Sequence, residues 1–254
     1  MKKLLAITAL SAALFFGQTA AAEEKAAEEV KPSHVEMVLV LDESGSMSDL
    51  TRDTIGGFNS MIEKEKKLDV DAHVTTVLFN DQYKMLYNRR ELKDVSKMTD
   101  KDYTPGGMTA LLDAVGRTIH KMDMVSGIHR KDKGNKVLFV IITDGEENDS
   151  REYTYADVKK LIKDRQENAG WEFIFLGANI DAAAAAENLG IDRDRAVKYK
   201  NTGSGVRANF KAVAEMSDSL AKSGRVSDRW KETVEKDEDD AADKQSAAVT
   251  SHRR

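Results

Sequence analysis

The strongest constraint on the fold is an uninterrupted apolar run, Met37–Leu41, followed directly by the polar segment Asp42–Met47. A strand with one solvated face alternates apolar and polar side chains, whereas a strand covered on both faces is apolar throughout. Val137–Ile142 is a second run of this kind, and it ends in the acidic turn Thr143–Glu146. The two runs predict central strands of a parallel sheet.

Helical and strand periodicity alternate along the rest of the chain. The further predicted strands are Val70–Leu78, Tyr83–Tyr87, Phe173–Leu176 and Ala196–Lys200, and the predicted helices are Asp53–Lys67, Ala110–Met124, Tyr155–Glu167, Asp181–Leu189 and Val206–Ala221. The tight turn at Asn80 and Asp81 makes the strand after it an antiparallel edge partner. We therefore expect an α/β fold with a doubly wound, mainly parallel sheet, one antiparallel edge strand and helices on both faces.

The N-terminus, residues 1–22, has the three parts of a secretory signal peptide. Lys2 and Lys3 precede the apolar run Leu4–Phe16, and small residues lead to Ala22. The apolar run is shorter than the roughly 20 residues that span a bilayer. We expect export to the periplasm or the extracellular space, with membrane attachment only if this segment is retained.

Composition divides the rest of the chain into three parts. Residues 23–34 are a charged spacer, residues 35–223 are the domain, and residues 224–254 are a charged tail that we expect to be disordered. The chain carries 39 basic and 44 acidic residues, a formal charge of −5, which argues against a nucleic-acid partner. It has no cysteine, which excludes disulfides and thiolate metal sites and leaves oxygen ligands or histidine.

Oxygen-bearing side chains follow both central strands. Asp42, Ser44 and Ser46 stand at alternate positions around Gly45 after the first, and Asp144 follows the second. In a parallel sheet, ligands bind in the crevice at the carboxyl ends of the strands. An all-oxygen set suits a hard cation, and Mg²⁺ fits few carboxylates combined with hydroxyls and waters. Residues of these types also cap helices, so the first loop by itself leaves both interpretations open.

The order of three loops carries a family resemblance. Asp42-x-Ser44-x-Ser46, Gly106–Leu111 and Thr143-Asp144-Gly145 closely resemble the von Willebrand factor A (VWA) domain, a Rossmann-like fold, and its metal-ion-dependent adhesion site (MIDAS). The resemblance extends from about Val35 to Leu220. Asp53–Asn59 and Phe173–Asn179 also resemble segments of stand-alone bacterial VWA proteins.

The resemblance implies the roles of five residues. Ser44, Ser46 and Thr109 would bind the metal through their hydroxyls, and Asp42 and Asp144 would act directly or through water. The expected ion is Mg²⁺, with Mn²⁺ or Ca²⁺ as alternatives. Outside the family, Thr109 could instead cap the helix that follows it.

The resemblance also implies what the site does. An Asp or Glu of a protein partner would complete the coordination, so the ion would bridge two proteins, and we expect no enzymatic activity and a monomer. Glu43 would point away from the ion, and Met108 would affect how closely a ligand approaches.

Other functions have weaker support in the sequence. A metal-dependent hydrolase could use Asp42 as a nucleophile, but enzymes of that kind carry a second Asp where this chain has Ser44. An envelope assembly scaffold with a purely structural metal is the other alternative. Gly203–Ala208 fits a dinucleotide fingerprint but lies in the last strand-helix unit, so we expect no nucleotide. The five histidines are scattered, and we expect surface or strand residues rather than ligands.

Overall fold

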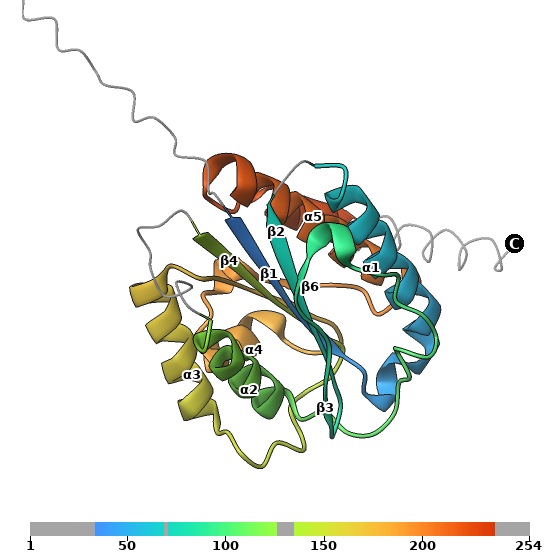
Figure 1. Cartoon of the computed structure of the whole chain (residues 1–254). Coiled ribbons are helices and arrows are strands. Elements are labelled where there is room, and N and C mark those ends of the chain that lie inside the picture. The colour runs from blue at the N-terminus through green and yellow to red at the C-terminus, as the bar shows by residue number, and fades with distance from the viewer. Residues whose placement is uncertain (1–33, 69–70, 126–134, 237–254) are drawn as a thin grey trace, which may run out of the picture.

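The structure is a computed structural model that describes residues 34–68, 71–125 and 135–236 (Figure 1). Its strands are β1 (His34–Asp42), β2 (Ala72–Phe79), β3 (Tyr83–Glu91), β4 (Asn135–Thr143), β5 (Glu172–Gly177) and β6 (Ala196–Lys198). Its main helices are α1 (Thr51–Glu65), α2 (Leu111–Asp123), α3 (Tyr155–Asp164), α4 (Ala182–Leu189) and α5 (Gly203–Ser223). Each predicted strand and helix is present, with ends that differ by a few residues.

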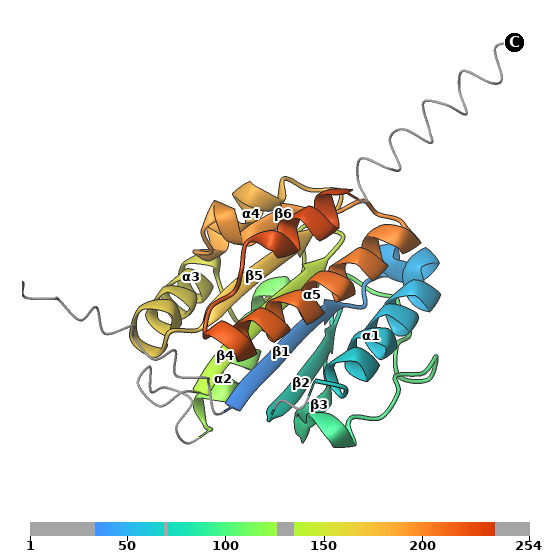
Figure 2. The ribbon, with the colours of Figure 1, turned by 90° about the horizontal axis from the view of Figure 1, so that it is seen from above.

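The six strands form one sheet in the order β3-β2-β1-β4-β5-β6. All neighbours are parallel except β2 and β3, so the predicted doubly wound sheet with one antiparallel edge strand is confirmed. Helices α1 and α5 cover one face, side by side in Figure 2, and α2, α3 and α4 cover the other. The chain leaves β1 toward β2 on one side and returns as β4 on the other, which makes the β1–β4 junction the switch point of the sheet.

Strand β1 is apolar throughout because each face of the sheet has its own core. Met37 and Leu39 pack with α1 and α5, whereas Val38 and Val40 pack with α2, α3 and α4. All four side chains are fully buried. The continuous run therefore reports burial on both faces, as the sequence predicted.

Gly57 allows helices α1 and α5 to approach closely at one point of their contact. A Cβ at Gly57 would lie 2.5 Å from the ring of Phe210 on α5. Phe210 in turn packs edge-on against Phe58 of α1, with ring centroids 6.2 Å apart. The glycine thus makes room for an aromatic contact that joins the two helices on this face.

The predicted solvated tail is wrong for residues 224–236. Residues 229–236 form a further helix, and Val226, Trp230 and Val234 are buried in the core beside α5. Only these three apolar residues at helical spacing mark the segment in an otherwise charged sequence, and the sequence analysis gave the charge more weight. Residues 237–254 lie outside the described residues.

The predicted signal peptide and nearly all of the predicted spacer also lie outside the described residues, so they stay predictions. Among the residues that the structure describes, no helix is long and apolar enough to cross a membrane.

Trp230 should contribute strongly to stability. Its side chain is 1% exposed, and truncation of a buried tryptophan to alanine typically costs about 3–5 kcal/mol. We expect Trp230→Ala to lower the free energy of unfolding by that amount in urea denaturation. The control Arg229→Ala alters an exposed neighbour and should change it by less than about 0.5 kcal/mol. Equal stability of the two variants would refute the docking of this segment.

Glu65 is a buried acid between α1 and α5. One carboxylate oxygen accepts a hydrogen bond from Ser217 at 2.5 Å, and no group among the described residues bonds to the other. Burial raises the pKa of Glu65 from 4.5 to about 7. The folded protein therefore holds a proton here that the unfolded chain releases between about pH 4.5 and 7, so stability falls as the pH rises through this window.

Replacing Glu65 should remove this pH dependence. The pKa shift corresponds to on the order of 3 kcal/mol of stability, which is lost as the pH rises from about 4.5 to 7. Glu65→Gln should be more stable than the wild type at pH 8 and close to it at pH 5, as measured by urea denaturation. Glu63→Gln, an exposed change on the same helix, should follow the wild type at both values. A Glu65→Gln curve parallel to the wild type would rule out the proposed proton.

Candidate metal site

The three loops of the predicted site meet at the carboxyl ends of β1 and β4. The parallel register that pairs Leu41 with Ile142 places Asp42 beside Thr143. The Thr143 hydroxyl donates to Asp42 Oδ2 at 2.6 Å, and the backbone N–H of Ser44 donates to Asp42 Oδ1 at 2.7 Å. Both oxygens of the Asp42 carboxylate are thereby fixed in direction.

Hydroxyls link the first loop to the acid of the third loop. Ser44 Oγ and Ser46 Oγ lie 3.1 Å apart, and Ser46 Oγ donates to Asp144 Oδ1 at 2.5 Å. Asn201 donates to Asp144 Oδ2 at 3.3 Å. Asp42, Ser44 and Asp144 are buried, whereas Ser46 is exposed, so the cluster opens to solvent on the Ser46 side.

Thr109 enters from the second loop. A Cβ on Gly145 would lie 3.9 Å from Thr109 Oγ1, which places this hydroxyl next to the Asp144–Gly145 turn. The Thr109 backbone N–H donates to Asn148 Oδ1 at 2.8 Å, and its carbonyl accepts from the N–H groups of Asn148 and Asp149. The structure therefore brings together all five predicted residues, although the Thr109 hydroxyl itself makes no hydrogen bond to another described residue.

Backbone contacts hold the first two loops together. Gly45 N–H donates to the carbonyl of Gly107 at 3.2 Å, and Gly106 N–H donates to the carbonyl of Glu43 at 2.9 Å. Gly107 has φ +76°, and a Cβ there would fall 1.9 Å from Asp81 Oδ1. Glycine at this position thus meets both a backbone and a steric requirement.

The geometry argues against simple helix capping. The residue before α2 is Ala110, without a side-chain cap, and Ser44 precedes a short 3₁₀ helix (Gly45–Leu50) without capping it. Glu147 instead accepts from Leu112 N–H at 2.9 Å in the first turn of α2. The hydroxyls of Ser44 and Thr109 are therefore not used for capping, which favours the metal interpretation.

Several residues of the site escaped the sequence analysis. Thr143 stands inside the recognised motif but had no assigned role, and the Tyr103 hydroxyl donates to the Asp42 carbonyl at 2.6 Å. Asn179, at φ +57°, donates to the Asp144 carbonyl at 3.2 Å. Asn201 lies just after β6. No periodicity in the sequence marks these contacts, because they depend on which loops the sheet brings together.

The electrostatics of the site favour a cation. Burial raises the pKa of Asp42, and the nearby Asp144 charge raises it further. Within the described part of the chain, neither acid pairs with a Lys or Arg side chain. Two buried carboxylates and three hydroxyls form an oxygen donor set, which fits a hard divalent ion.

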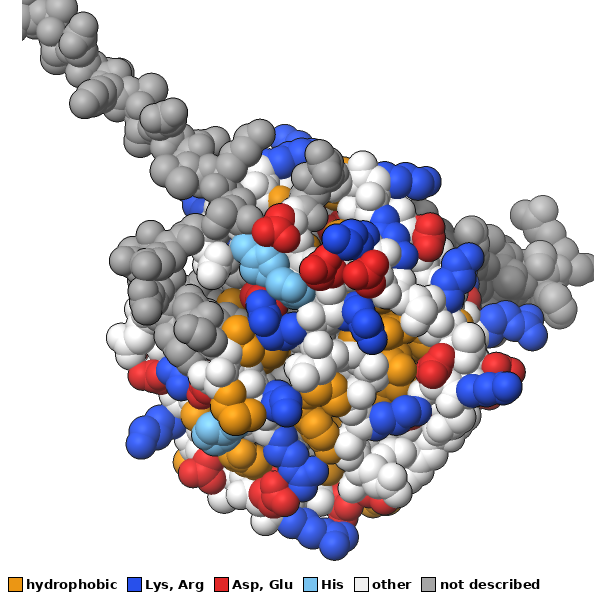
Figure 3. Space-filling model, in the orientation of Figure 1, with side chains coloured by type: hydrophobic (Ala, Val, Ile, Leu, Met, Phe, Trp, Pro, Cys, Tyr) orange, Lys and Arg blue, Asp and Glu red, His pale blue; other side chains and the backbone are white. Residues whose placement is uncertain are grey.

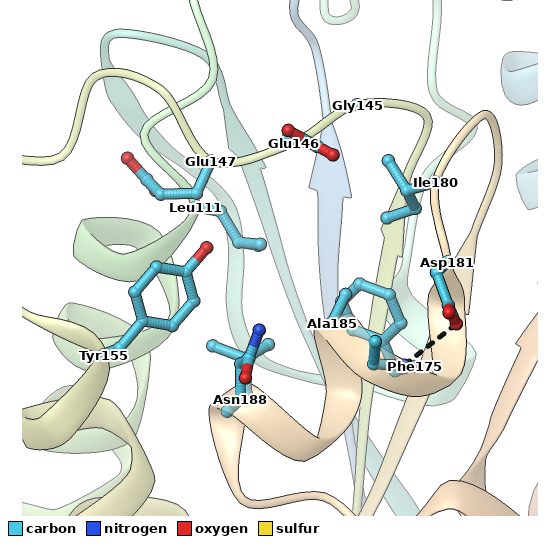
Figure 4. A pocket seen from close by; sticks show the side chains of 12 residues that line it. Leu111, Gly145, Glu146, Glu147, Tyr155, Phe175, Ile180, Asp181, Ala185 and Asn188 are labelled. Atoms are coloured by element: carbon cyan, nitrogen blue, oxygen red, sulfur yellow. Dashed lines mark hydrogen bonds between the residues drawn. The ribbon is translucent and has the colours of Figure 1, made fainter.

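A cleft of about 250 Å³ lies beside this cluster (Figure 4). Leu111, Phe175 and Ile180 supply apolar walls, and the acids Glu146 and Asp181 lie at its edge. Glu146 is exposed, as expected for a solvated rim charge. Glu147 instead accepts hydrogen bonds from the loop around it, from Asp149 N–H at 3.0 Å among others, so its role is structural.

Known proteins resemble this chain at the level of family and fold. The family model vWA-TerF-like, described as the vWA found in the TerF C terminus, matches residues 34–190. Comparison with curated protein sequences found no match.

Three solved structures share the fold. A von Willebrand factor type A protein from Catenulispora acidiphila is 15% identical at TM-score 0.50, over 72% of this chain and 42% of that chain. The proximal thread matrix protein 1 from the mussel byssus, with a zinc occupied MIDAS motif, is 13% identical at 0.51, over 73% and 46%. The vWF domain of the type V pili tip protein Mfa5 from Porphyromonas gingivalis is 13% identical at 0.51, over 76% and 98%.

At these identities the structural likeness extends to the fold alone, and this chain spans less than half the length of the first two structures. The family match covers more than half of the chain and includes the first strand, the three loops and α4. With the sheet order and the loops described above, it shows that this chain belongs to the von Willebrand factor A domain family.

Proposed function

We propose that this chain is an exported VWA module that binds a protein partner through Mg²⁺ held by Asp42, Ser44, Ser46, Thr109 and Asp144. The observation that carries the proposal is the meeting of three loops at the switch point of the sheet. There, two buried acids that pair with no Lys or Arg among the described residues adjoin an exposed hydroxyl. This arrangement offers a cation one open side.

The residues around the ligands fix their positions. Thr143 and the Ser44 N–H hold the Asp42 carboxylate, and Asn201 holds Asp144. When bound, Mg²⁺ supplies an electrophilic centre with a coordination position free for an oxygen from outside the protein. A carboxylate of the partner suits that position, because it adds charge attraction to the contact.

The surroundings of the site define a rim for the partner. Met108 is 51% exposed next to Thr109 and offers an apolar contact. Glu146 and Asp181 border the adjoining cleft. Glu43 lies on the other side of its loop, where its carboxylate accepts from the Thr104 N–H and hydroxyl, which supports the expectation that it points away from the ion.

Binding rather than catalysis is the activity that these contacts support. The side chains that hydrogen-bond to the two acids are Ser, Thr and Asn, and none of these is a base that could activate water at neutral pH. The proposal of export rests on the predicted signal peptide. A pilus tip protein that shares the fold is consistent with it. Zinc in the byssal protein illustrates that other divalent ions can enter sites of this type.

The test is capture of envelope proteins from the source cell by the purified chain, in Mg²⁺ and in EDTA side by side. A specific partner captured in Mg²⁺ and lost in EDTA supports bridging. Capture that survives EDTA would favour the scaffold, and hydrolysis of a generic phosphoester by the Mg²⁺-loaded chain would favour the hydrolase.

Metal binding should depend on Asp42. We expect one Mg²⁺ per chain in calorimetry. Loss of a group that only supports a metal ligand typically weakens metal binding roughly 10–100-fold. Because Asp42 is a ligand itself, Asp42→Ala should weaken Mg²⁺ binding by more than that. The variant should stay folded by circular dichroism, because the apolar cores on both faces of the sheet are buried without any contribution from the ion. Asp192→Ala, an exposed change, should bind Mg²⁺ normally. Unchanged affinity in Asp42→Ala would sink the assignment.

A variant of Thr109 should distinguish binding of a partner through the ion from binding of the ion alone. Thr109→Ala should weaken partner binding strongly while Mg²⁺ binding survives in part, because the other two loops still hold the ion. Thr233→Ala is the control, because it also removes a threonine hydroxyl. That hydroxyl donates to Glu215 of α5 at 2.7 Å, outside the candidate metal site, so the variant should bind the partner normally.

The partner should carry one essential Asp or Glu. Changing it to the amide should cost about 1.5–3 kcal/mol of binding energy, the range for a charge-assisted contact. Binding that tolerates both Thr109→Ala and removal of every acid from the partner's contact surface would exclude adhesion through the ion.

A further inference from the structure

The amino ends of the strands carry a second cluster, at the edge of the sheet opposite the candidate MIDAS. His34 and Glu36 lie two residues apart on β1, and the register pairs Glu36 with His73 on β2. All three side chains therefore lie on the same face of the sheet. In Figure 3, which has the orientation of Figure 1, histidine side chains lie beside acidic and basic ones in the region where Figure 1 shows the first residues of β1 and β2.

Three potential ligand atoms converge in this cluster. His34 Nε2 lies 2.8 Å from His73 Nδ1 and 3.0 Å from Glu36 Oε1, and His73 Nδ1 lies 3.5 Å from Glu36 Oε1. Tetrahedral Zn²⁺ with bonds of about 2.0–2.1 Å separates its ligand atoms by about 3.3 Å. The three distances lie on either side of that value. Among the described residues, this is the one group of His, Cys, Asp or Glu with such convergence.

The hydrogens available at this point do not account for both close contacts of His34 Nε2, with His73 Nδ1 and with Glu36 Oε1. Asp71 Oδ2 lies 3.2 Å from His34 Nδ1, which places a hydrogen on Nδ1 and leaves Nε2 of the neutral ring as an acceptor. Arg89 Nη2, which can only donate, lies 3.3 Å from His73 Nδ1 and so requires a lone pair there. Glu36 Oε1 is an acceptor as well. A hydrogen on His34 Nε2 could be directed at only one of the other two atoms.

We propose that His34, Glu36 and His73 form a second metal site, which binds Zn²⁺. Two imidazoles and one carboxylate suit Zn²⁺ rather than Mg²⁺ or Ca²⁺, and three protein ligands leave one position for water. Asp71 orients His34 through its other ring nitrogen, as carboxylates do at many zinc sites. The side chains of His34, Glu36 and His73 are 12%, 3% and 24% exposed, so the site is sheltered but accessible.

Arg89 is the competing cation. Its Nε donates to Glu36 Oε1 at 3.0 Å and to Oε2 at 3.2 Å, and its Nη2 contacts Oε1. Zn²⁺ would take Oε1 and displace Nη2, while Nε can keep Oε2. Since the Arg89 side chain is 31% exposed, Nη2 can turn to water. Removal of this charge should therefore strengthen metal binding.

The experiment uses the chain without a polyhistidine tag, in an Asp42→Ala background that disables the oxygen site. Calorimetry with Zn²⁺ should show one site, and a tenfold excess of Mg²⁺ should not compete. His34→Ala and His73→Ala should each weaken Zn²⁺ binding by at least tenfold, Asp71→Asn by about tenfold, and Arg89→Met should tighten it several-fold. Bound Co²⁺ should give the intense visible absorption of a tetrahedral complex.

The controls separate this site from other histidines. His120→Ala, where the ring contacts the Tyr153 hydroxyl at 2.8 Å, should leave Zn²⁺ affinity unchanged. So should joint replacement of His129 and His252, which lie outside the described residues. His73→Gln serves if an alanine variant fails to fold by circular dichroism. Absence of Zn²⁺ binding in the background protein, or binding that survives both His34→Ala and His73→Gln, would overturn the proposal.

Discussion

The parallel pairing of β1 with β4 is the constraint on which the rest of the structure depends. It joins the two halves of the chain at the centre of the sheet and aligns the residues at which both strands end. Asp42 and Asp144 come close because their strands are neighbours, not because of any property of the loops themselves. A shift of this pairing by one residue would turn every side chain of β1 to the other face and would separate the acids.

Burial of two carboxylates at this junction is costly, and the structure offsets part of that cost with hydrogen bonds. Thr143 and the Ser44 N–H serve Asp42, while Ser46 and Asn201 serve Asp144. These groups are neutral, so they orient the acids without cancelling their charge. The negative potential stays available to a cation, and this is why the same contacts that hold the loops also prepare a metal site.

The two edges of the sheet differ in chemistry. The carboxyl edge presents hydroxyls and carboxylates, which suit a hard ion. The amino edge presents two imidazoles and the acid Glu36, next to Arg89. Parallel strands create both clusters in the same way, since equivalent ends of neighbouring strands must lie together. The edges differ in that glycine-bearing loops shape the first cluster, whereas register between β1 and β2 forms the second.

Local patterns in the sequence determined much of this protein. The uninterrupted apolar runs predicted central strands, because short runs of this kind are typical of strands that are covered on both faces. The order of the three loops predicted the family and all five candidate ligands. A carboxylate that directly follows a buried strand can be recognised from the sequence, because the two are adjacent along the chain. The antiparallel edge strand was predicted from the turn at Asn80 for the same reason.

Only the tertiary structure decided which distant residues meet. Tyr103 and Asn201 gain their roles from neighbours far along the chain, and no local pattern marks them. Thr143 stands in a recognised motif, but only the pairing of β1 with β4 shows that its hydroxyl donates to Asp42. The charged residues around Trp230 led to the prediction of a solvated tail. Three apolar side chains at helical spacing become buried only if the rest of the fold offers a surface on which they can pack, and the sequence of the segment does not show that surface. His34 and His73 stand 39 positions apart and gave no ligand motif. The register of two parallel strands brings them together, and register is a property of the sheet rather than of either segment.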